Sequence, residues 1–132
     1  MKILLFFLAF FLLAESSSSY AQQRKTKYIP VSVEEADKIL AKKRMVILDV
    51  RTPEEVAQGF VPGAIFHNFN SPGFKNSLSN LPKNKPYFVY CRSGKRSGKA
   101  VEMMKEMGFK KVYEMNAGFP AYQAFKNKPP LQ

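Results

Sequence analysis

The segment VYCRSGKRSGKA contains Cys91, the single cysteine of the chain. The thiol follows an apolar run typical of a buried strand, and a helical pattern begins a few residues later. Arg92, Lys95 and Arg96 place three cations within five residues of it. Nearby cations and helix N-termini lower a cysteine pKa, and the thiolate is the nucleophilic form. The pattern predicts a reactive thiol; the alternative is a small buried core residue.

The residues between the predicted strand and helix have the composition of an anion-binding loop. Gly94 and Gly98 permit close backbone approach, so that amide groups can point toward the sulfur. Loop amides and the free N–H groups at a helix start bind anions. We therefore expect Cys91 to be the nucleophile. The expected substrate-binding residues are Arg92, Ser93, Gly94, Lys95, Arg96 and Ser97.

The elements that must position this loop alternate between strand and helix patterns. Apolar runs predict strands at 28–32, 45–50, 86–91 and 111–115, with a shorter one after the 61–63 turn. Helical patterns occupy 33–43, 53–58, 74–78, 97–107 and 119–125. This order predicts a single α/β domain whose central, mostly parallel sheet carries helices on both faces. Sites in such sheets lie beyond the carboxyl ends of the strands, where the predicted strand ends should converge.

Polar residues follow one of the other predicted strands. Asp49 and Arg51 should organise that strand end around the reactive residues rather than react themselves. We expect Arg51 to pair with Glu54 or Glu55, which lie in the first turn of the next helix. His67, the single histidine, is interpreted as a surface or packing residue, and the methionines of the 97–107 helix as core rather than metal ligands.

The N-terminus has the features of a secretory signal peptide. Lys2 precedes an unbroken apolar run over 3–14, and Ser19 and Ala21 supply small residues at a cleavage site. The run is shorter than the roughly 20 residues that span a bilayer. We expect a signal peptide at 1–21, an extension at 22–29 and the domain at 30–128. The protein should be periplasmic or secreted, with no stable membrane anchor after cleavage; the alternative is an uncleaved anchor.

The net charge of +11 limits the classes of partner. Such a surface attracts small oxyanions, acidic proteins or anionic lipid. The lysines are scattered, and no finger or helix-turn-helix pattern is present. We therefore expect no nucleic-acid partner. A lone cysteine in an exported chain forms no internal disulfide, which again points to a free thiol or intermolecular pairing.

Three segments resemble the rhodanese-like family. ILDVRTPEEVAQGFVPGAIFHNF (47–69) is similar to its Asp-Val-Arg and Pro-Gly-Ala-Ile pattern, VYCRSGKRS to its active-site loop, and GFKKVYEMNAGFPAYQ (108–123) to its closing segment. The resemblance extends over about residues 30 to 125. Phe60 stands where the family has a histidine, Ala117 where it has the first of two glycines, and Tyr122 where it has a tryptophan.

The resemblance implies a single-domain sulfurtransferase without metal or organic cofactor. Cys91 would take a sulfane sulfur from a small anionic donor such as thiosulfate. The resulting persulfide would pass it to cyanide or to a thiol acceptor, such as a thiol of an exported protein. Two alternatives stay open: a non-catalytic thiol or persulfide-carrier module that binds a protein, and a phosphatase or arsenate reductase. Four residues separate Cys91 from Arg96, whereas related phosphatase loops have five; the shorter loop fits sulfur better than phosphate.

Overall fold

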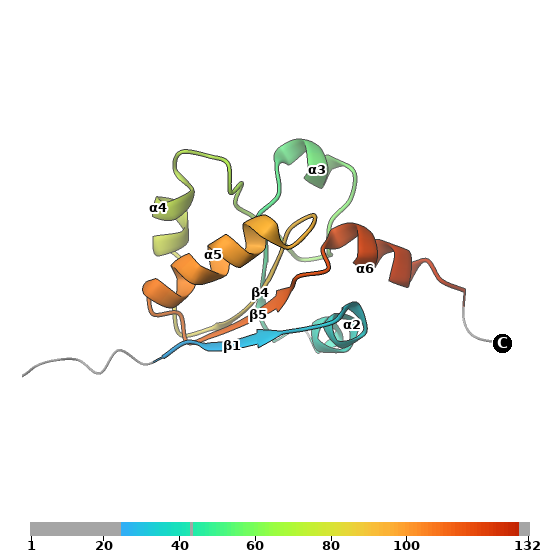
Figure 1. Cartoon of the computed structure of the whole chain (residues 1–132), viewed down its shortest axis with the longest axis horizontal. Coiled ribbons are helices and arrows are strands. Elements are labelled where there is room, and N and C mark those ends of the chain that lie inside the picture. Colours follow the sequence, from blue (N-terminus) through green and yellow to red (C-terminus); the bar gives the residue numbers. More distant parts are fainter. Residues whose placement is uncertain (1–24, 43, 130–132) are drawn as a thin grey trace, which may run out of the picture.

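The fold is a single five-stranded sheet with helices on both faces, as predicted (Figure 1). This computed structural model describes residues 25–42 and 44–129. The strands are β1 (Lys27–Pro30), β2 (Val46–Asp49), β3 (Ile65–Phe66), β4 (Pro86–Tyr90) and β5 (Lys111–Met115). They lie in the order β1-β5-β4-β2-β3. The sheet was predicted to be mostly parallel, and every strand pairing of the described residues is parallel.

Two apolar clusters hold the helices against the sheet. One lies under α4 (Phe74–Ser79) and α5 (Lys95–Glu106); the other lies under α2 (Val33–Ala41) and α6 (Phe119–Lys126). The short helix α3 (Pro53–Ala57) follows the carboxyl end of β2. The central strand β4 contributes Tyr87 and Val89 to the first cluster and Phe88 and Tyr90 to the second. Burial on both faces explains its continuous apolar sequence.

Two helix starts that precede the site residues carry reciprocal caps. The Glu35 amide donates to the Ser32 hydroxyl, and the Ser32 amide donates to the Glu35 carboxylate. Thr52 and Glu55 form the same capping box at the start of α3. Each box satisfies two N–H groups that would otherwise lack an intrahelical partner. The second box fixes the position of Glu55 close to the end of β2.

Several element boundaries differ from the prediction by one or two residues, and two of these differences concern the site loop and the start of the domain. Helix α5 begins at Lys95 rather than Ser97, because Gly94 adopts a left-handed conformation with φ of 88° that ends the loop early. The loop after Cys91 therefore contains only Arg92, Ser93 and Gly94. Strand β1 begins at Lys27, inside the segment expected to be an extension, and pairs with β5 over four residues.

The predicted signal peptide, 1–21, lies outside the described residues, as does the start of the extension at 22–24. Over residues 25–42 and 44–129, no helix has the length and apolar character needed to cross a bilayer.

Candidate active site

Cys91 follows directly after β4, at the carboxyl end of the central strand. Strands β2 and β5 flank β4, so the segments after Asp49 and Met115 meet the cysteine at the same edge. The convergence predicted from the strand pattern is confirmed. The side chain of Cys91 has no exposed surface, and its sulfur lies at the base of the loop that leads into α5.

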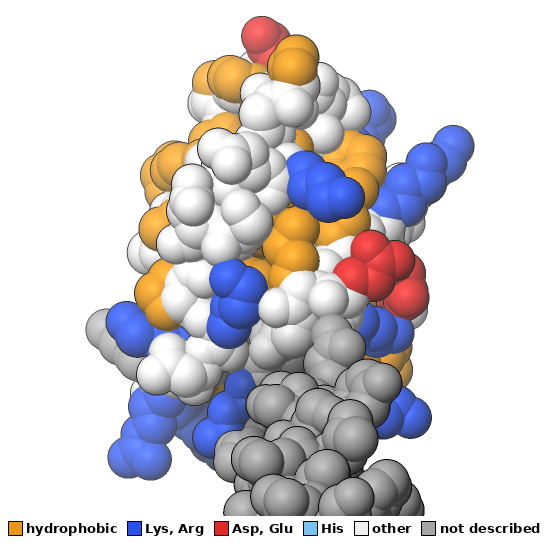
Figure 2. All heavy atoms as spheres, turned by 90° about the vertical axis from the view of Figure 1, so that its left-hand side faces the viewer, with side chains coloured by type: hydrophobic (Ala, Val, Ile, Leu, Met, Phe, Trp, Pro, Cys, Tyr) orange, Lys and Arg blue, Asp and Glu red, His pale blue; other side chains and the backbone are white. Residues whose placement is uncertain are grey.

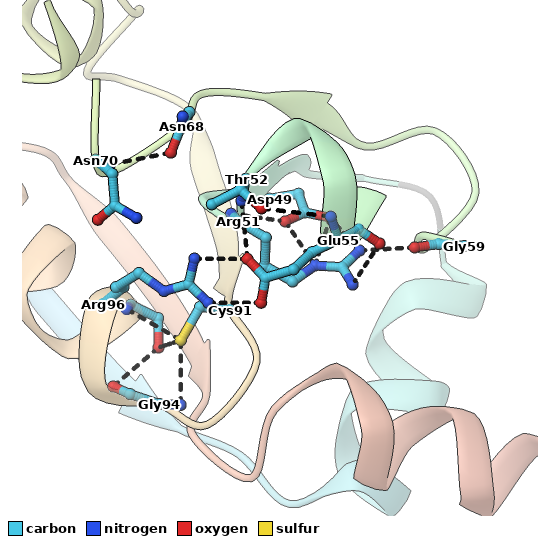
Figure 3. Close-up of polar contacts among 11 residues, drawn as sticks. Asp49, Arg51, Thr52, Glu55, Gly59, Asn68, Asn70, Cys91, Gly94 and Arg96 are labelled. Carbon is cyan, nitrogen blue, oxygen red and sulfur yellow. Dashed lines mark hydrogen bonds and ion pairs between the residues drawn. The ribbon is translucent and has the colours of Figure 1, made fainter. Parts of the chain in front are cut away.

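Hydrogen-bonding groups surround the sulfur of Cys91 (Figure 3). The amide nitrogens of Gly94 and Ser97 donate to Sγ from 3.1 and 3.4 Å, and the Ser97 hydroxyl oxygen lies 3.4 Å from Sγ, where it accepts from the thiol. Burial opposes ionisation of the thiol, but the Ser97 hydroxyl and amide and the amides of Ser93 and Gly94 outweigh it. The pKa of Cys91 therefore lies below its ordinary value. The geometry is that of a cradle for a negatively charged sulfur.

Two glycines lock this loop against the segment after β5. A Cβ on Gly94 would lie 2.3 Å from the carbonyl oxygen of Asn116, and a Cβ on Gly118 would lie 1.8 Å from that of Arg92. Both glycines have positive φ, which other residues adopt at a cost. The Phe119 amide also donates to the Cys91 carbonyl at 2.9 Å. The segment 116–119 thus supports the cradle from outside, although it contributes no group to the sulfur.

A buried carboxylate lies behind the cradle. The Ser97 hydroxyl donates to Glu114 Oε1 at 2.8 Å, and the Tyr28 hydroxyl donates to Glu114 Oε2 at 2.7 Å. Glu114 is 4% exposed and Ser97 is fully buried. Burial, followed by the hydrogen bond to Glu114, raises the pKa of Tyr28 to about 12. A continuous polar path therefore runs from Cys91 through Ser97 to Glu114 and Tyr28.

Arg96 forms a two-pronged ion pair with Glu55 (Figure 3). Its two terminal nitrogens each lie 2.7 Å from a carboxylate oxygen. This hydrogen bonding lowers the pKa of Glu55 to about 2, against the opposing effect of burial. The pair stays ionised at all but strongly acidic pH. Arg96 was predicted to bind an anionic substrate; here its fork is held by Glu55, so a substrate anion has to share the guanidinium with that carboxylate.

Asp49 and Arg51 form a buried polar centre beside the site. Arg51 Nη2 lies 2.7 Å from Asp49 Oδ2 and donates to the Gly59 carbonyl at 2.8 Å. The guanidinium carbon lies 4.1 Å from the centre of the Phe119 ring, and the Tyr90 hydroxyl donates to Asp49 at 2.6 Å. The prediction that Arg51 pairs with a carboxylate of the next helix is wrong. Asp49 is nearer and equally buried, so it takes the guanidinium.

The positions of Asp49 and Arg51 fit a supporting role. Their contacts join the end of β2 to β4, to α6 and to Gly59. Among the described residues, no hydrogen bond or ion pair joins either side chain to the sulfur of Cys91. Whether they affect chemistry stays a prediction.

The outer residues of the loop face solvent. Arg92, Ser93 and Lys95 are exposed. A polar hollow of about 360 Å³ lies beside them, lined by Arg92, Glu55 and residues of α6. A larger hollow of about 660 Å³ lies between α2, α6 and the 61–63 turn and does not include the loop. The smaller hollow adjoins the loop through Arg92, and Cys91 lines neither hollow.

The described residues contain no cluster of histidine, cysteine and acidic side chains that could hold a metal ion. His67 Nδ1 lies 2.9 Å from the Ser77 hydroxyl, and burial lowers the pKa of the imidazole. Met104 is fully buried, and Met103 and Met107 pack against the same core. The interpretations of His67 as a packing residue and of the methionines as core are confirmed.

The sequence reasoning missed three residues of the site. Glu55 was interpreted as an acid in the first turn of its helix and a candidate partner for Arg51, whereas its carboxylate pairs with Arg96. Glu114 and Tyr28 were assigned no role. One signal was available. Glu114 lies two residues after Val112 in an apolar strand, so both side chains are on the same face of the sheet and Glu114 faces the core. A buried carboxylate requires polar partners.

Comparisons with known proteins identify the class. The family model of the rhodanese-like domain matches residues 32–125. The chain belongs to the rhodanese-like domain family. It is 34% identical over 93 residues to the "Putative sulfurtransferase YtwF" of Bacillus subtilis, covering 70% of this chain and 86% of that protein. It is 28% identical over 94 residues to the "Thiosulfate sulfurtransferase GlpE" of Pseudoalteromonas translucida, covering 71% of this chain and 88% of that one.

Solved structures agree with this assignment. A rhodanese-like domain protein from Staphylococcus aureus superposes with a TM-score of 0.60 at 33% identity, covering 74% of this chain and 91% of that one. The human single-domain sulfurtransferase TSTD1 superposes with a TM-score of 0.62 at 20% identity, covering 76% and 97%, and shows the shared fold alone. The fold is therefore the single α/β domain of this family.

Proposed function

We propose that this protein is a thiosulfate-type sulfurtransferase that carries sulfur as a persulfide on Cys91. The observation that carries the proposal is the pair of backbone N–H groups, of Gly94 and Ser97, that donate to Sγ from 3.1 and 3.4 Å. Preorganised donors stabilise negative charge where it resides. They favour the attacking thiolate, and with a small outward shift they favour the terminal sulfur of a persulfide. The relatives named as sulfurtransferases support the same reaction class.

The proposed reaction has two balanced steps. The Cys91 thiolate attacks the outer sulfur of thiosulfate, the S–S bond of thiosulfate breaks, and its electron pair leaves with sulfite. Cyanide or a thiolate then attacks the terminal sulfur of the persulfide, which restores the Cys91 thiolate and releases thiocyanate or a new persulfide. No external proton or electron is consumed in the transfer to cyanide. Metal and organic cofactors are not needed for either step.

We assign the donor site to the outer face of the loop. Arg92 and Lys95 are exposed cations at its rim, and Arg96 lies deeper beside Glu55. A dianion such as thiosulfate would be attracted to the rim and would compete with Glu55 for Arg96. Because Cys91 is fully buried, approach to Sγ requires this part of the loop to open. The site therefore admits only small donors, or larger molecules whose thiol or persulfide group projects far enough to reach Sγ.

The structure gives less support to phosphate chemistry. The three-residue loop Arg92–Gly94 closes the Gly94 amide on a single sulfur atom. A site of that size fits sulfur better than phosphate.

The test is a transfer assay with matched variants. The protein is incubated with thiosulfate and cyanide, and thiocyanate release is measured for the wild type, Cys91→Ser, Arg96→Ala and Lys126→Ala. We expect release to disappear in Cys91→Ser and to fall more in Arg96→Ala than in Lys126→Ala. Equal effects of Arg96→Ala and Lys126→Ala would contradict the donor site. Hydrolysis of a phosphate ester without thiocyanate would overturn the reaction class, and neither activity would leave a carrier or binding module.

We further propose that the protein acts outside the cytoplasm. The support is the signal-peptide pattern of residues 1–21. N-terminal sequencing of the protein from fractionated cells should find a chain that begins near Gln22 in the exported fraction. A chain that keeps Met1 and stays in the cytoplasmic fraction would contradict this.

A further inference from the structure

The edge of the sheet opposite Cys91 is strongly basic. The amino ends of β1, β5 and β4 meet there, and each is preceded or begun by lysines. The basic edge is defined here by Lys25, Lys27, Lys83, Lys85, Lys110 and Lys111. Arg44, just before β2, adds a further exposed cation on the same side of the sheet.

Backbone pairing holds these lysines side by side. Lys27 and Lys111 are register partners in adjacent parallel strands. The Lys27 amide donates to the Lys110 carbonyl at 3.0 Å, and the Lys110 amide donates to the Lys83 carbonyl at 2.8 Å. The charges are thus concentrated by the fold, although they are far apart in the sequence. Concentrated charge gives a local field that scattered lysines do not.

Most acidic side chains lie elsewhere. Glu34 and Glu35 begin α2 and Glu54 and Glu55 begin α3, all toward the carboxyl edge. Toward the basic edge, the acids are those in the second half of α5, where Glu102 pairs with Lys105. Figure 2 looks onto the left-hand side of Figure 1, where the strands begin, and shows basic side chains in several places on this face and acidic ones in few.

We propose that the basic edge binds the surface of a membrane rich in anionic phospholipid, with Cys91 on the side facing away from it. The charge of this edge is complementary to anionic headgroups, to which clusters of lysine and arginine are attracted. The described chain enters the fold at the same edge, so its first lysines, Lys25 and Lys27, belong to the cluster. The six lysines lie beyond the predicted cleavage site, so the surface is the same whether or not residues 1–21 are removed.

Side-chain chemistry favours a lipid surface over a nucleic acid. All six defining residues are lysines, which act as point charges, whereas arginine is the usual choice for bidentate recognition of phosphates in a fixed geometry. Binding of single-stranded nucleic acid also relies on free aromatic faces. Here Lys111 lies over the Tyr113 ring at 4.9 Å and Lys83 over the Phe109 ring at 5.6 Å.

The test is vesicle co-sedimentation of the full chain as isolated from its host. The probes are vesicles of pure phosphatidylcholine and vesicles that also contain phosphatidylglycerol, at low and high salt. The edge variant replaces Lys27, Lys85, Lys110 and Lys111 by glutamine. The control variant removes the same charge from exposed lysines elsewhere: Lys38, Lys75, Lys99 and Lys128. The ratio of binding to the two vesicle types separates the contribution of charge from that of any apolar segment. Circular dichroism checks that both variants fold.

We expect salt-sensitive preference for the anionic vesicles, which the edge variant loses by about 600-fold, at about fivefold for each of its four cations near the surface. The control variant should lose much less. Equal losses in the two variants would overturn the proposal, because net charge alone would then explain binding. It would also be overturned if the wild type ignored anionic vesicles, or if the same lysines bound a short single-stranded RNA more tightly than the vesicles. These outcomes are independent of sulfur transfer.

Discussion

Replacing Ser97 by alanine should weaken the acidity of Cys91 and leave Glu114 short of a partner. The substitution removes an oxygen that lies 3.4 Å from the sulfur and 2.8 Å from Glu114 Oε1. The backbone amide of residue 97 is kept. The experiment therefore separates the hydroxyl from the amide part of the cradle.

A hydrogen bond to a charged group is worth about 1.5–3 kcal/mol. The single Ser97 hydroxyl proton is shared between Sγ at 3.4 Å and Glu114 at 2.8 Å, so the effect on the thiol lies at or below the lower end of this range. Because 1.4 kcal/mol corresponds to a factor of ten, the thiolate fraction below the pKa should fall by up to about tenfold. A more basic thiolate is a better nucleophile with a Brønsted slope of about 0.4–0.5, so alkylation at mildly acidic pH should slow by only about threefold. The midpoint of the pH–rate profile should move up, because the lost contact favoured the thiolate.

The same substitution should lower stability. Glu114 keeps the Tyr28 hydroxyl but loses that of Ser97, and at 4% exposure little water can replace it. Leaving a buried polar group unsatisfied costs about 1–3 kcal/mol of unfolding free energy. The cost should be smaller in a Glu114→Gln background, because an amide carries no buried charge that needs the hydroxyl.

The assays are iodoacetamide inactivation as a function of pH and chemical denaturation. Ser79→Ala is the matched control, since its exposed hydroxyl contacts only the Asn76 carbonyl in α4. An unchanged or lower alkylation midpoint in Ser97→Ala would refute the role of the hydroxyl. Equal stability losses in the wild-type and Glu114→Gln backgrounds would refute the coupling between Ser97 and Glu114.

The ion pair and the glycine lock give further predictions. Glu55→Gln should free the Arg96 guanidinium and lower the KM for thiosulfate severalfold with a smaller change in kcat; a KM that rises would show that Glu55 orients Arg96 for the donor. Gly118→Ala should cost at least about 2 kcal/mol of unfolding free energy, because its Cβ would meet the Arg92 carbonyl oxygen at 1.8 Å with φ of 84°. Gly73→Ala, where the nearest atom is 4.0 Å away, is the control, and equal stabilities in denaturant would contradict the lock.

The sequence patterns predicted the sheet, because each apolar run is bounded by a cap or a glycine that can be recognised locally. Ser32 and Thr52 mark their helix starts through capping boxes that need only a spacing of three residues. The start of α5 was misplaced because Gly94 is left-handed there, and a glycine in the sequence does not reveal its φ. Local rules thus predicted where elements lie better than where they begin.

The partners within the site were harder to predict. Cys91 and its loop are contiguous, so the cradle could be inferred from composition. The pairs Arg96–Glu55 and Ser97–Glu114 join different elements, and choosing the partner required the packing of α3 and β5 against α5. Arg51 shows the same limit: sequence spacing favoured the next helix, whereas burial brought Asp49 closer.

The most direct test of the central claim is the intact mass of the protein after incubation with thiosulfate and removal of the excess. A persulfide on Cys91 predicts a gain of one sulfur atom in the wild type, located to the Cys91 peptide and lost on addition of cyanide. Cys91→Ser should show no gain. A wild-type mass that stays unchanged, or a gain that persists in Cys91→Ser, would contradict the account.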